Sequence, residues 1–217
     1  MKIAAGQTLL FIGDSITDGG RARPAGESPG LGAGYVSLVD AELRAQFPDR
    51  RIRVLNTGIS GNRVPDLAAR WEAGVLAHRP AWLSVMIGIN DVWRHYDQPR
   101  MRDRVDADRF EKTYAALLEG TRPQLAGLVL MSPYFLEPDR NDPMRRQMDA
   151  YGAIVRLLAE RFDALFIDVQ AAFDRVLAQQ TSRSLSHDRI HPNHAGHQII
   201  ARAFLDGLAI PAAANSL

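Results

Sequence analysis

Residues that could carry out nucleophilic chemistry stand near both ends of the chain. Ser15 follows an apolar run and precedes Ile16, whose backbone N–H is available at the expected turn. Asp188 and His191 stand three residues apart, where the chain enters its last expected helix. If that turn lies beside Ser15, His191 can take the serine proton while Asp188 orients the imidazole and stabilises the imidazolium. These three residues are therefore a candidate catalytic triad.

A site of this kind also needs hydrogen-bond donors where negative charge develops on the tetrahedral intermediate. The candidates for this oxyanion hole are the backbone N–H groups of Ser15 and Gly61 and the side chain of Asn90. Gly61 is suitable because it has no side chain to obstruct a substrate. Taken singly, Gly61 and Asn90 are also typical turn residues. Their spacing alone therefore leaves both interpretations open.

A second serine matches the nucleophile-elbow pattern G-x-S-x-G, between Gly26 and Gly30. No strand is expected before it. Ser28 is followed by Pro29, whose ring nitrogen has no hydrogen to offer an oxyanion. We interpret this segment as a turn within a Gly- and Pro-rich loop over residues 21–34, and we favour Ser15 as the nucleophile.

Metal binding is an alternative interpretation of the C-terminal residues. Asp188, His191, His194 and His197 follow one another at intervals of three, and this spacing alone does not dismiss a divalent metal site. Pro192 interrupts the helix that would align them, however. We therefore expect His194 and His197 to cap and cover the start of the last helix, and we expect no metal.

The composition is that of an ordinary globular protein. A chain of 217 residues with 46% hydrophobic residues can bury one good core, so we expect a single domain over residues 1–217. The formal net charge of +1 provides no excess field to hold nucleic acid or an anionic bilayer. The absence of cysteine excludes disulfides and a cysteine nucleophile. The short N-terminal apolar stretch does not resemble a signal-peptide core, so a cytoplasmic location is expected.

Apolar runs of strand length alternate with segments of helical periodicity along the whole chain. The expected strands cover residues 8–12, 52–55, 82–87, 125–131 and 165–167. The expected helices cover residues 35–46, 66–77, 107–119, 144–161, 171–178 and 193–208. This alternation predicts a three-layer α/β/α sandwich with a central parallel sheet of about five strands. Ligands of such sheets bind beyond the carboxyl ends of the strands, which is where Ser15, Gly61 and Asn90 stand.

Four sequence blocks together resemble the SGNH (GDSL-type) serine esterases and lipases. They contain Ser15 in GDSITD, Gly61 in GISGN, Asn90 in GIND, and Asp188 with His191 in DRIHP. The resemblance implies a flavodoxin-like SGNH hydrolase fold, a Ser-His-Asp triad and a three-donor oxyanion hole. It also implies that the protein uses neither a metal nor an organic cofactor.

Longer runs resemble the bacterial acetylxylan esterases of this superfamily: GDSITD, GISGN, MIGINDVWR, DPMRR and DRIHP. This closer resemblance implies an intracellular serine carboxylesterase that removes acetyl groups from short xylo-oligosaccharides or other acetylated sugars. It also implies a homo-oligomer, of which an octamer is one form. The sequence departs from the expected pattern at His187, where an aromatic residue is expected just before Asp188. Such an aromatic would stack on a sugar ring.

The candidate substrate-binding residues are Asp14, Trp93, Tyr96 and Tyr134, all close to the ends of expected strands. The three aromatic residues could form a flat wall for a sugar ring, or could equally belong to the core or to a subunit contact. The segment from Pro133 to Met144 is expected to form a loop over the site or an oligomer arm.

Two other functions remain open at this point. One is an esterase for short- or medium-chain lipids, or a lysophospholipase-like enzyme, of the same superfamily. The other is a non-catalytic carbohydrate-binding module that retains the sheet without the chemistry, because a fold can persist when its function is lost.

Overall fold

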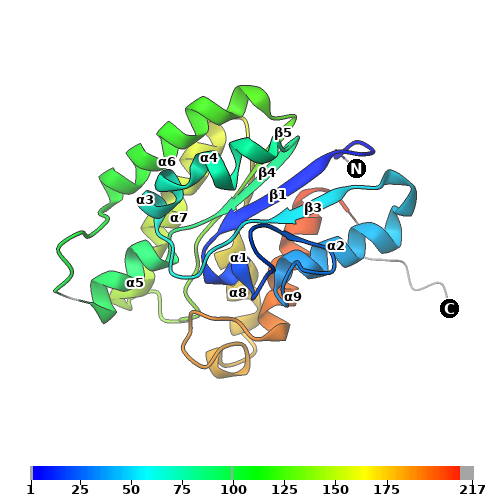
Figure 1. Cartoon of the computed structure of the whole chain (residues 1–217). Helices are drawn as coiled ribbons and strands as arrows, with labels where there is room; N and C mark the ends of the chain where they lie inside the picture. The colour runs from blue at the N-terminus through cyan, green and yellow to red at the C-terminus, as the bar shows by residue number, and fades with distance from the viewer. Residues whose placement is uncertain (1, 99, 211–217) are drawn as a thin grey trace.

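The computed structural model describes residues 2–98 and 100–210. A six-stranded sheet with the order β2-β3-β1-β4-β5-β6 lies at the centre of the molecule (Figure 1). Its strands are β1 (Thr8–Gly13), β2 (Gly26–Glu27), β3 (Arg53–Asn56), β4 (Trp82–Met86), β5 (Gly127–Met131) and β6 (Leu165–Ile167). Five of the six strands run parallel, as the alternation of strands and helices predicts.

The sixth strand corrects the interpretation of the loop over residues 21–34. Gly26 and Glu27 form the short strand β2, which pairs antiparallel with the outer edge of β3. A strand of only two residues is too short to show an alternation of apolar and polar residues. The Gly- and Pro-rich composition of this segment therefore predicts a loop and not a strand. Ser28 follows this edge strand and is exposed, next to β3 and away from the expected end of β1.

The helices are α1 (Ser15–Asp18), α2 (Tyr35–Gln46), α3 (Val64–Ala69), α4 (Trp71–Gly74), α5 (Ile89–Asp97), α6 (Ala107–Thr121), α7 (Pro143–Arg161), α8 (Val169–Leu177) and α9 (His194–Gly207). The six expected helices lie near their expected positions, with one exception, and the structure adds α1 and α5, which were not predicted from the sequence. The single helix expected over residues 66–77 is divided into α3, α4 and a 3-10 turn at Leu76–His78. The division occurs because Arg70 leaves the helical conformation, with φ −120° and ψ 12°.

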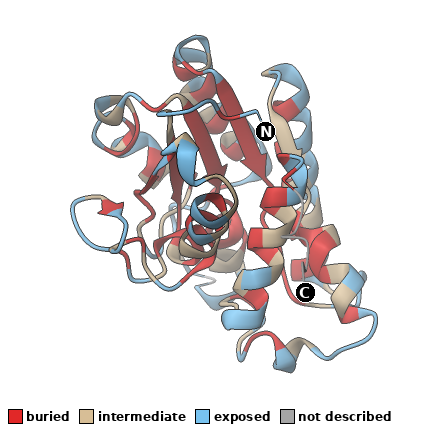
Figure 2. Cartoon of the chain, turned by 90° about the vertical axis from the view of Figure 1, so that its right-hand side faces the viewer, coloured by how far each residue is buried: buried red, intermediate tan, exposed pale blue. Residues whose placement is uncertain are grey.

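The helices form two layers, one on each face of the sheet (Figure 1). Helix α9 packs against α2 and α8 in one layer, whereas α6 packs against α3 and α7, and α7 against α5, in the other. Every residue of β4 and β5 is buried, because parallel strands in this architecture are covered on both faces. Figure 2 shows the buried strands between partly exposed helices. The predicted three-layer α/β/α fold is therefore confirmed.

Strand β1 is the point at which the strand order reverses. The chain passes from β1 to β3 on one side and then to β4 on the other, so β1 lies between them. Crevices that bind ligands form at such switch points, beyond the carboxyl ends of the strands. The segments that follow these three neighbouring strands carry Ser15, Gly61 and Asn90. Within the described residues, no helix combines the length and apolar character needed to span a bilayer.

Candidate active site

Ser15 is placed by a sharp change from strand to helix. Strand β1 ends at Gly13, and Ser15 is the first residue of α1. Asp14 caps this helix by accepting a 3.0 Å hydrogen bond from the backbone N–H of Ile16. Gly13 is required for close packing, because a Cβ there would lie 2.3 Å from the carbonyl oxygen of Met86 on β4. The serine is therefore held two residues after Gly13, the last residue of β1 that pairs with β4.

Ser15, His191 and Asp188 form a continuous chain of hydrogen bonds. The Oγ of Ser15 lies 3.1 Å from Nε2 of His191, and Nδ1 of His191 lies 2.6 Å from Oδ2 of Asp188. A carboxylate can only accept, so Nδ1 carries the hydrogen and Nε2 is left free to accept from the serine hydroxyl. This tautomer is the one that a general base needs in order to activate a serine.

The second carboxylate oxygen of Asp188 is also fully used. It accepts hydrogen bonds from the hydroxyl of Ser186 at 2.9 Å and from the backbone N–H groups of Ile190 at 2.9 Å and His191 at 2.8 Å. Partial burial disfavours the charge of Asp188, but the bonds from the His191 ring and from these other donors dominate and hold its pKa well below the usual range. Asp188 is therefore a charged and rigidly oriented partner for the imidazole.

The candidate oxyanion-hole donors Gly61 and Asn90 lie on the segments that follow β3 and β4, the two strands that flank β1. Gly61, with φ +82°, lies in the loop after β3, and Asn90 lies in the first turn of α5 after β4. The side-chain amide of Asn90 donates a 3.0 Å hydrogen bond to the backbone carbonyl of Asn62, the residue next to Gly61. This bond uses one amide hydrogen of Asn90 and leaves the second available for a substrate oxygen.

The loop that carries Asp188 and His191 is held by the segment that follows β5. The hydroxyl of Tyr134 donates to the carbonyl of Ile190 at 3.0 Å, and the backbone N–H of Leu136 donates to the carbonyl of Arg189 at 3.0 Å. Tyr134 and Leu136, in the segment from Pro133 to Met144, thus hold the loop of Asp188 and His191, and the segment leads into α7. Tyr134 is fully buried. Its ring has no surface for a sugar and belongs to the core, which is one of the alternatives that the sequence left open.

Asp14, another residue predicted to bind substrate, is not exposed to a ligand either. Its side chain is buried, and its carboxylate faces the backbone of α1. Burial raises the pKa of Asp14 to about 7, against the opposing effects of the Ile16 N–H and of nearby His191. Asp14 therefore helps to position Ser15 by capping helix α1, and its buried side chain does not contact a sugar.

Trp93 and Tyr96 do line a cavity beside the triad. This cavity of about 350 Å³ is bounded by α5, by the start of α7 and by the loop of Asp188; its lining includes Trp93, Tyr96, Asp97, Phe135, Asp142, Pro143, Met144, Asp188, Arg189 and Ile190. The ring of Trp93 meets that of His191 edge-on at a centroid distance of 5.9 Å, whereas Tyr96 is 43% exposed. The cavity thus offers an aromatic wall next to His191.

The histidines of the C-terminal cluster have different surroundings. His197 is turned toward helix α2, where its Nδ1 accepts a hydrogen bond from the backbone N–H of Tyr35 at 3.2 Å, and burial lowers its pKa to about 4. His194 is exposed at the start of α9. His187 is also exposed, with Nε2 3.6 Å from Oδ2 of Asp188. Across residues 2–98 and 100–210, no three carboxylate or imidazole groups gather in a metal-binding arrangement.

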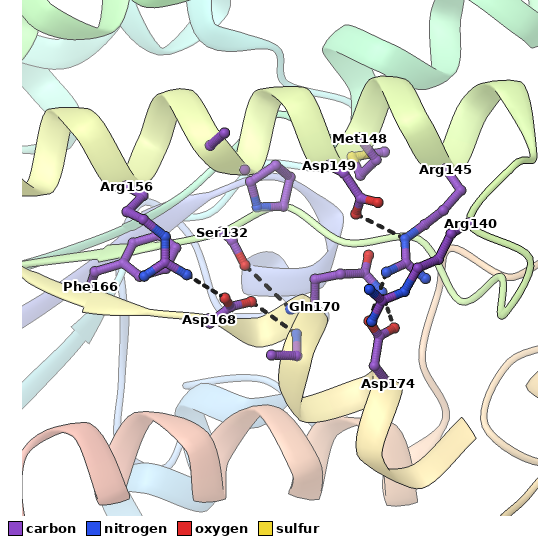
Figure 3. A pocket seen from close by; sticks show the side chains of 14 residues that line it. Ser132, Arg140, Arg145, Met148, Asp149, Arg156, Phe166, Asp168, Gln170 and Asp174 are labelled. Atoms are coloured by element: carbon purple, nitrogen blue, oxygen red, sulfur yellow. Dashed lines mark hydrogen bonds and ion pairs between the residues drawn. The ribbon is translucent and has the colours of Figure 1, made fainter. Parts of the chain in front are cut away.

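A second cavity of about 320 Å³ lies between α7 and α8, beyond β5 and β6 (Figure 3). Its charged side chains are paired with one another: Arg145 with Asp149 and Asp174, Arg140 with Asp174, and Arg156 with Asp168. None of the triad residues lines this cavity. Its arginines and aspartates neutralise each other, so we assign it no part in the reaction.

Two residues that support the site, Ser186 and Asn62, were not predicted from the sequence. Ser186 hydrogen-bonds to Asp188, and Asn62 provides the carbonyl that holds Asn90. Both lie within four residues of a residue that was identified, and Asn62 lies in the quoted GISGN block. Asn62 acts through its backbone carbonyl, and Ser186 acts through the orientation of its hydroxyl. Residue type indicates neither of these features.

The fold and this site together define a serine hydrolase, and comparison with known families agrees. The model of the GDSL-like lipase/acylhydrolase family matches residues 11–199, and the chain belongs to this family. It is a carboxylic ester hydrolase.

Individual relatives are similar over most of their length. An acetylxylan esterase of Geobacillus stearothermophilus is 53% identical over 208 residues, covering 94% of this chain and 95% of the relative. The crystal structure of Axe2, an acetylxylan esterase from that organism, has a TM-score of 0.96 at 52% identity and covers 97% of this chain and 98% of that one. A more distant relative, described as thioesterase 1, protease 1 and lysophospholipase of Escherichia coli, is 28% identical and covers 92% of this chain and 82% of its own.

Proposed function

We propose that this protein is a serine esterase that removes acetyl groups from short acetylated xylo-oligosaccharides or similar acetylated sugars. The observation that carries the proposal is the hydrogen-bonded chain from Ser15 through His191 to Asp188. We infer the acetylated-sugar substrate from the similarity to an acetylxylan esterase, which extends over nearly the whole of both chains. An aromatic-walled cavity beside the triad suits a sugar ring.

In the proposed mechanism, the Oγ of Ser15 attacks the acetyl carbonyl while Nε2 of His191 takes the hydroxyl proton. The resulting oxyanion accepts hydrogen bonds from the backbone N–H groups of Ser15 and Gly61 and from the Asn90 amide. The intermediate then collapses: the bond to the sugar oxygen breaks, His191 returns its proton to that oxygen, and an acetyl-serine remains.

Water completes the cycle. His191 removes a proton from a water molecule, whose oxygen attacks the acetyl-serine carbonyl at the same oxyanion hole. The second intermediate collapses to acetic acid, which ionises to acetate in solution, while the proton on His191 passes to the departing Oγ of Ser15. Asp188, whose pKa is held low by its hydrogen bonds, stays ionised throughout and stabilises each imidazolium state.

The test is hydrolysis of p-nitrophenyl acetate, butyrate and octanoate beside acetylated xylo-oligosaccharides, with and without a chelator. Wild type is compared with Ser15→Ala and with Ser28→Ala, which alters the other serine in a formal nucleophile-elbow pattern. We expect chelator-resistant activity that favours acetyl esters, is lost in Ser15→Ala and persists in Ser28→Ala.

The other outcomes separate the alternatives. A preference for octanoate would keep the triad and move the substrate to lipid esters. Sugar binding without hydrolysis would favour the carbohydrate-binding module, and activity that a divalent ion restores after chelation would favour a metal hydrolase. Full activity in Ser15→Ala would overturn the proposal.

The assembly and cellular location also belong to this proposal. We propose a cytoplasmic homo-oligomer, with the octamer as one expected form, that receives short oligosaccharides after their uptake. Light scattering coupled to size-exclusion chromatography measures the assembly, and fractionation of producing cells measures the location. A monomer, or a protein found outside the cytoplasm, would contradict the corresponding part.

A further inference from the structure

The interruption between α3 and α4 places an arginine against the ends of the strands. The Arg70 side chain is partly buried there, and its guanidinium makes three hydrogen bonds: Nε to Oδ1 of Asn62 at 2.6 Å, Nη1 to the carbonyl of Thr57 at 2.8 Å, and Nη2 to the carbonyl of Gly13 at 3.1 Å. Burial lowers the pKa of Arg70 to about 10. One planar group therefore connects the end of β1 with both ends of the loop after β3.

Each partner of Arg70 is close in the chain to a donor of the proposed oxyanion hole. Gly13 lies two residues before Ser15, and Asn62 directly follows Gly61. The carbonyl of the same Asn62 holds the Asn90 amide at 3.0 Å. All three donors are thus linked to the guanidinium through a short covalent or hydrogen-bonded connection.

The guanidinium is rigid, so these hydrogen bonds can hold the groups that they connect in fixed positions. Its N–H groups point in fixed directions within one plane, so three simultaneous bonds fix the relative positions of the three acceptors. An error of about 1 Å in the position of a catalytic group can cost about 10²-fold in rate. Arg21 also holds this loop, with Nε 2.6 Å from the carbonyl of Gly58, but its Nη1 bonds to the carbonyls of Ala22 and Pro24, on the loop over residues 21–34.

Helix α4 leaves a space for this side chain. At Gly74, an added Cβ would lie 3.0 Å from Nη1 of Arg70 and 3.4 Å from Cδ1 of Ile12. A methyl group there would press on the guanidinium while leaving every charge and hydrogen-bonding group of the chain unchanged.

We propose that Arg70 is a positioning residue of the oxyanion hole, whose guanidinium fixes the Gly61 loop, and through Asn62 the Asn90 amide, relative to Ser15. The proposal rests on the serine-esterase function proposed above. It predicts a loss in turnover, because the donors act most strongly on the oxyanion of the transition state. It predicts little change in KM.

The experiment compares Arg70→Met and Arg70→Lys with Arg122→Met. Arg122 makes a similar set of bonds away from the site, to the carbonyls of Phe162 at 2.7 Å and Leu125 at 3.2 Å. With p-nitrophenyl acetate we expect kcat to fall by about 10- to 100-fold in Arg70→Met, with KM within about twofold. We expect Arg122→Met to keep kcat within about twofold, and Arg70→Lys to remain impaired because a single ammonium cannot make three planar bonds.

A double-mutant cycle distinguishes positioning from general destabilisation. In the background of Asn90→Ala, the Arg70→Met replacement should cost several-fold less than in the wild-type background, since one of the three donors that Arg70 positions is already absent. The Arg122→Met replacement should have the same effect in both backgrounds. Full additivity of Arg70→Met with Asn90→Ala, or a wild-type kcat in Arg70→Met, would overturn the proposal.

Gly74→Ala provides a test that retains Arg70. We expect kcat to fall by about three- to tenfold with no loss in thermal midpoint, and an unchanged kcat would count against the proposal. If Arg70→Met does not fold, Gly74→Ala and Arg70→Lys decide the question. Failure of the proposed function itself has a different signature, namely wild type without esterase activity or Ser15→Ala with full activity.

Discussion

Asp188 contacts His191 twice, once through the ring and once through the backbone. Its Oδ2 accepts from Nδ1 at 2.6 Å, and its Oδ1 accepts from the backbone N–H of the same residue at 2.8 Å. The carboxylate therefore determines both the tautomer of the imidazole and the turn on which the imidazole is presented.

Replacing Asp188 with Asn tests this double contact. The amide oxygen of Asp188→Asn can still accept from the backbone, but the amide nitrogen would face Nδ1 and favour the wrong tautomer. We expect kcat to fall by about 10³- to 10⁴-fold. The loss should be similar across the neutral and alkaline range, because the low pKa of Asp188 keeps it ionised there. Steady-state kinetics with p-nitrophenyl acetate measures the effect. Asp139→Asn on the neighbouring exposed loop is the control, and equal activity of the two variants would contradict the assignment.

Asn90→Ala removes the only side-chain donor of the proposed oxyanion hole. We expect kcat to fall by about 10²- to 10³-fold with a small change in KM, since the bond strengthens as the oxyanion forms. The Asn62 carbonyl loses its partner at the same time, so thermal unfolding should be measured alongside the kinetics. A change in kcat below about twofold would remove Asn90 from this role.

Tyr96→Ala tests the cavity beside the triad. We expect KM for acetylated xylo-oligosaccharides to rise by about three- to tenfold, or about 0.7–1.4 kcal/mol, while kinetics with p-nitrophenyl acetate stay near those of wild type. The matched control is Leu157→Ala, because Leu157 is the other large hydrophobic residue that is exposed in the described part of the chain. Equal KM values for the sugar in wild type and Tyr96→Ala would place the sugar elsewhere.

Asp91→Asn should change how stability depends on pH. Oδ1 of Asp91 accepts from the backbone N–H of Val64 at 2.9 Å, while Oδ2 is buried without a partner in the described chain. Burial raises the pKa of Asp91 to about 7. The folded state therefore holds a proton that the unfolded state has released, and stability falls as pH rises from about 4 to about 7.

An asparagine cannot lose that proton, so the free energy of unfolding of Asp91→Asn should fall less steeply over the same range. Asp14, whose pKa is raised to about 7 as well, contributes a slope that remains in the variant. Urea unfolding at several pH values measures the difference, with Asp108→Asn on the exposed face of α6 as the control. A constant difference between Asp91→Asn and wild type from pH 5 to pH 8 would contradict the prediction.

His197→Ala should destabilise the fold near neutral pH by about 1 kcal/mol, because His197 replaces the missing side-chain cap of α2. The pKa of His197 is lowered to about 4, so the folded protein disfavours its protonation. Its contribution is present above pH 6.5 and is lost as the pH falls toward 4. Thermal melts of His197→Ala and of the exposed control His194→Ala provide the measurement, and equal midpoints would contradict the capping role.

The sequence alone was sufficient to predict the parallel sheet and most of the helices. It also singled out Ser15, Asp188 and His191, which the structure joins by hydrogen bonds, and the candidate donors Gly61 and Asn90. These features have local signals: apolar runs mark the strands, and small polar blocks mark the ends of neighbouring strands. The short strand β2 and the division at Arg70 have no such signal, because each depends on contacts with a distant part of the chain.

The tertiary structure decided which of the aromatic candidates could reach a substrate and what supports the triad. Tyr134 and Tyr96 both follow strands, yet one is buried under the His191 loop and the other is exposed beside it. Residue type cannot distinguish them, because an aromatic side chain suits either environment. The 176 residues that separate Ser15 from His191 likewise give no indication of the 3.1 Å between their side chains. That distance is set by the packing of α9 against the sheet and by the loop after β5.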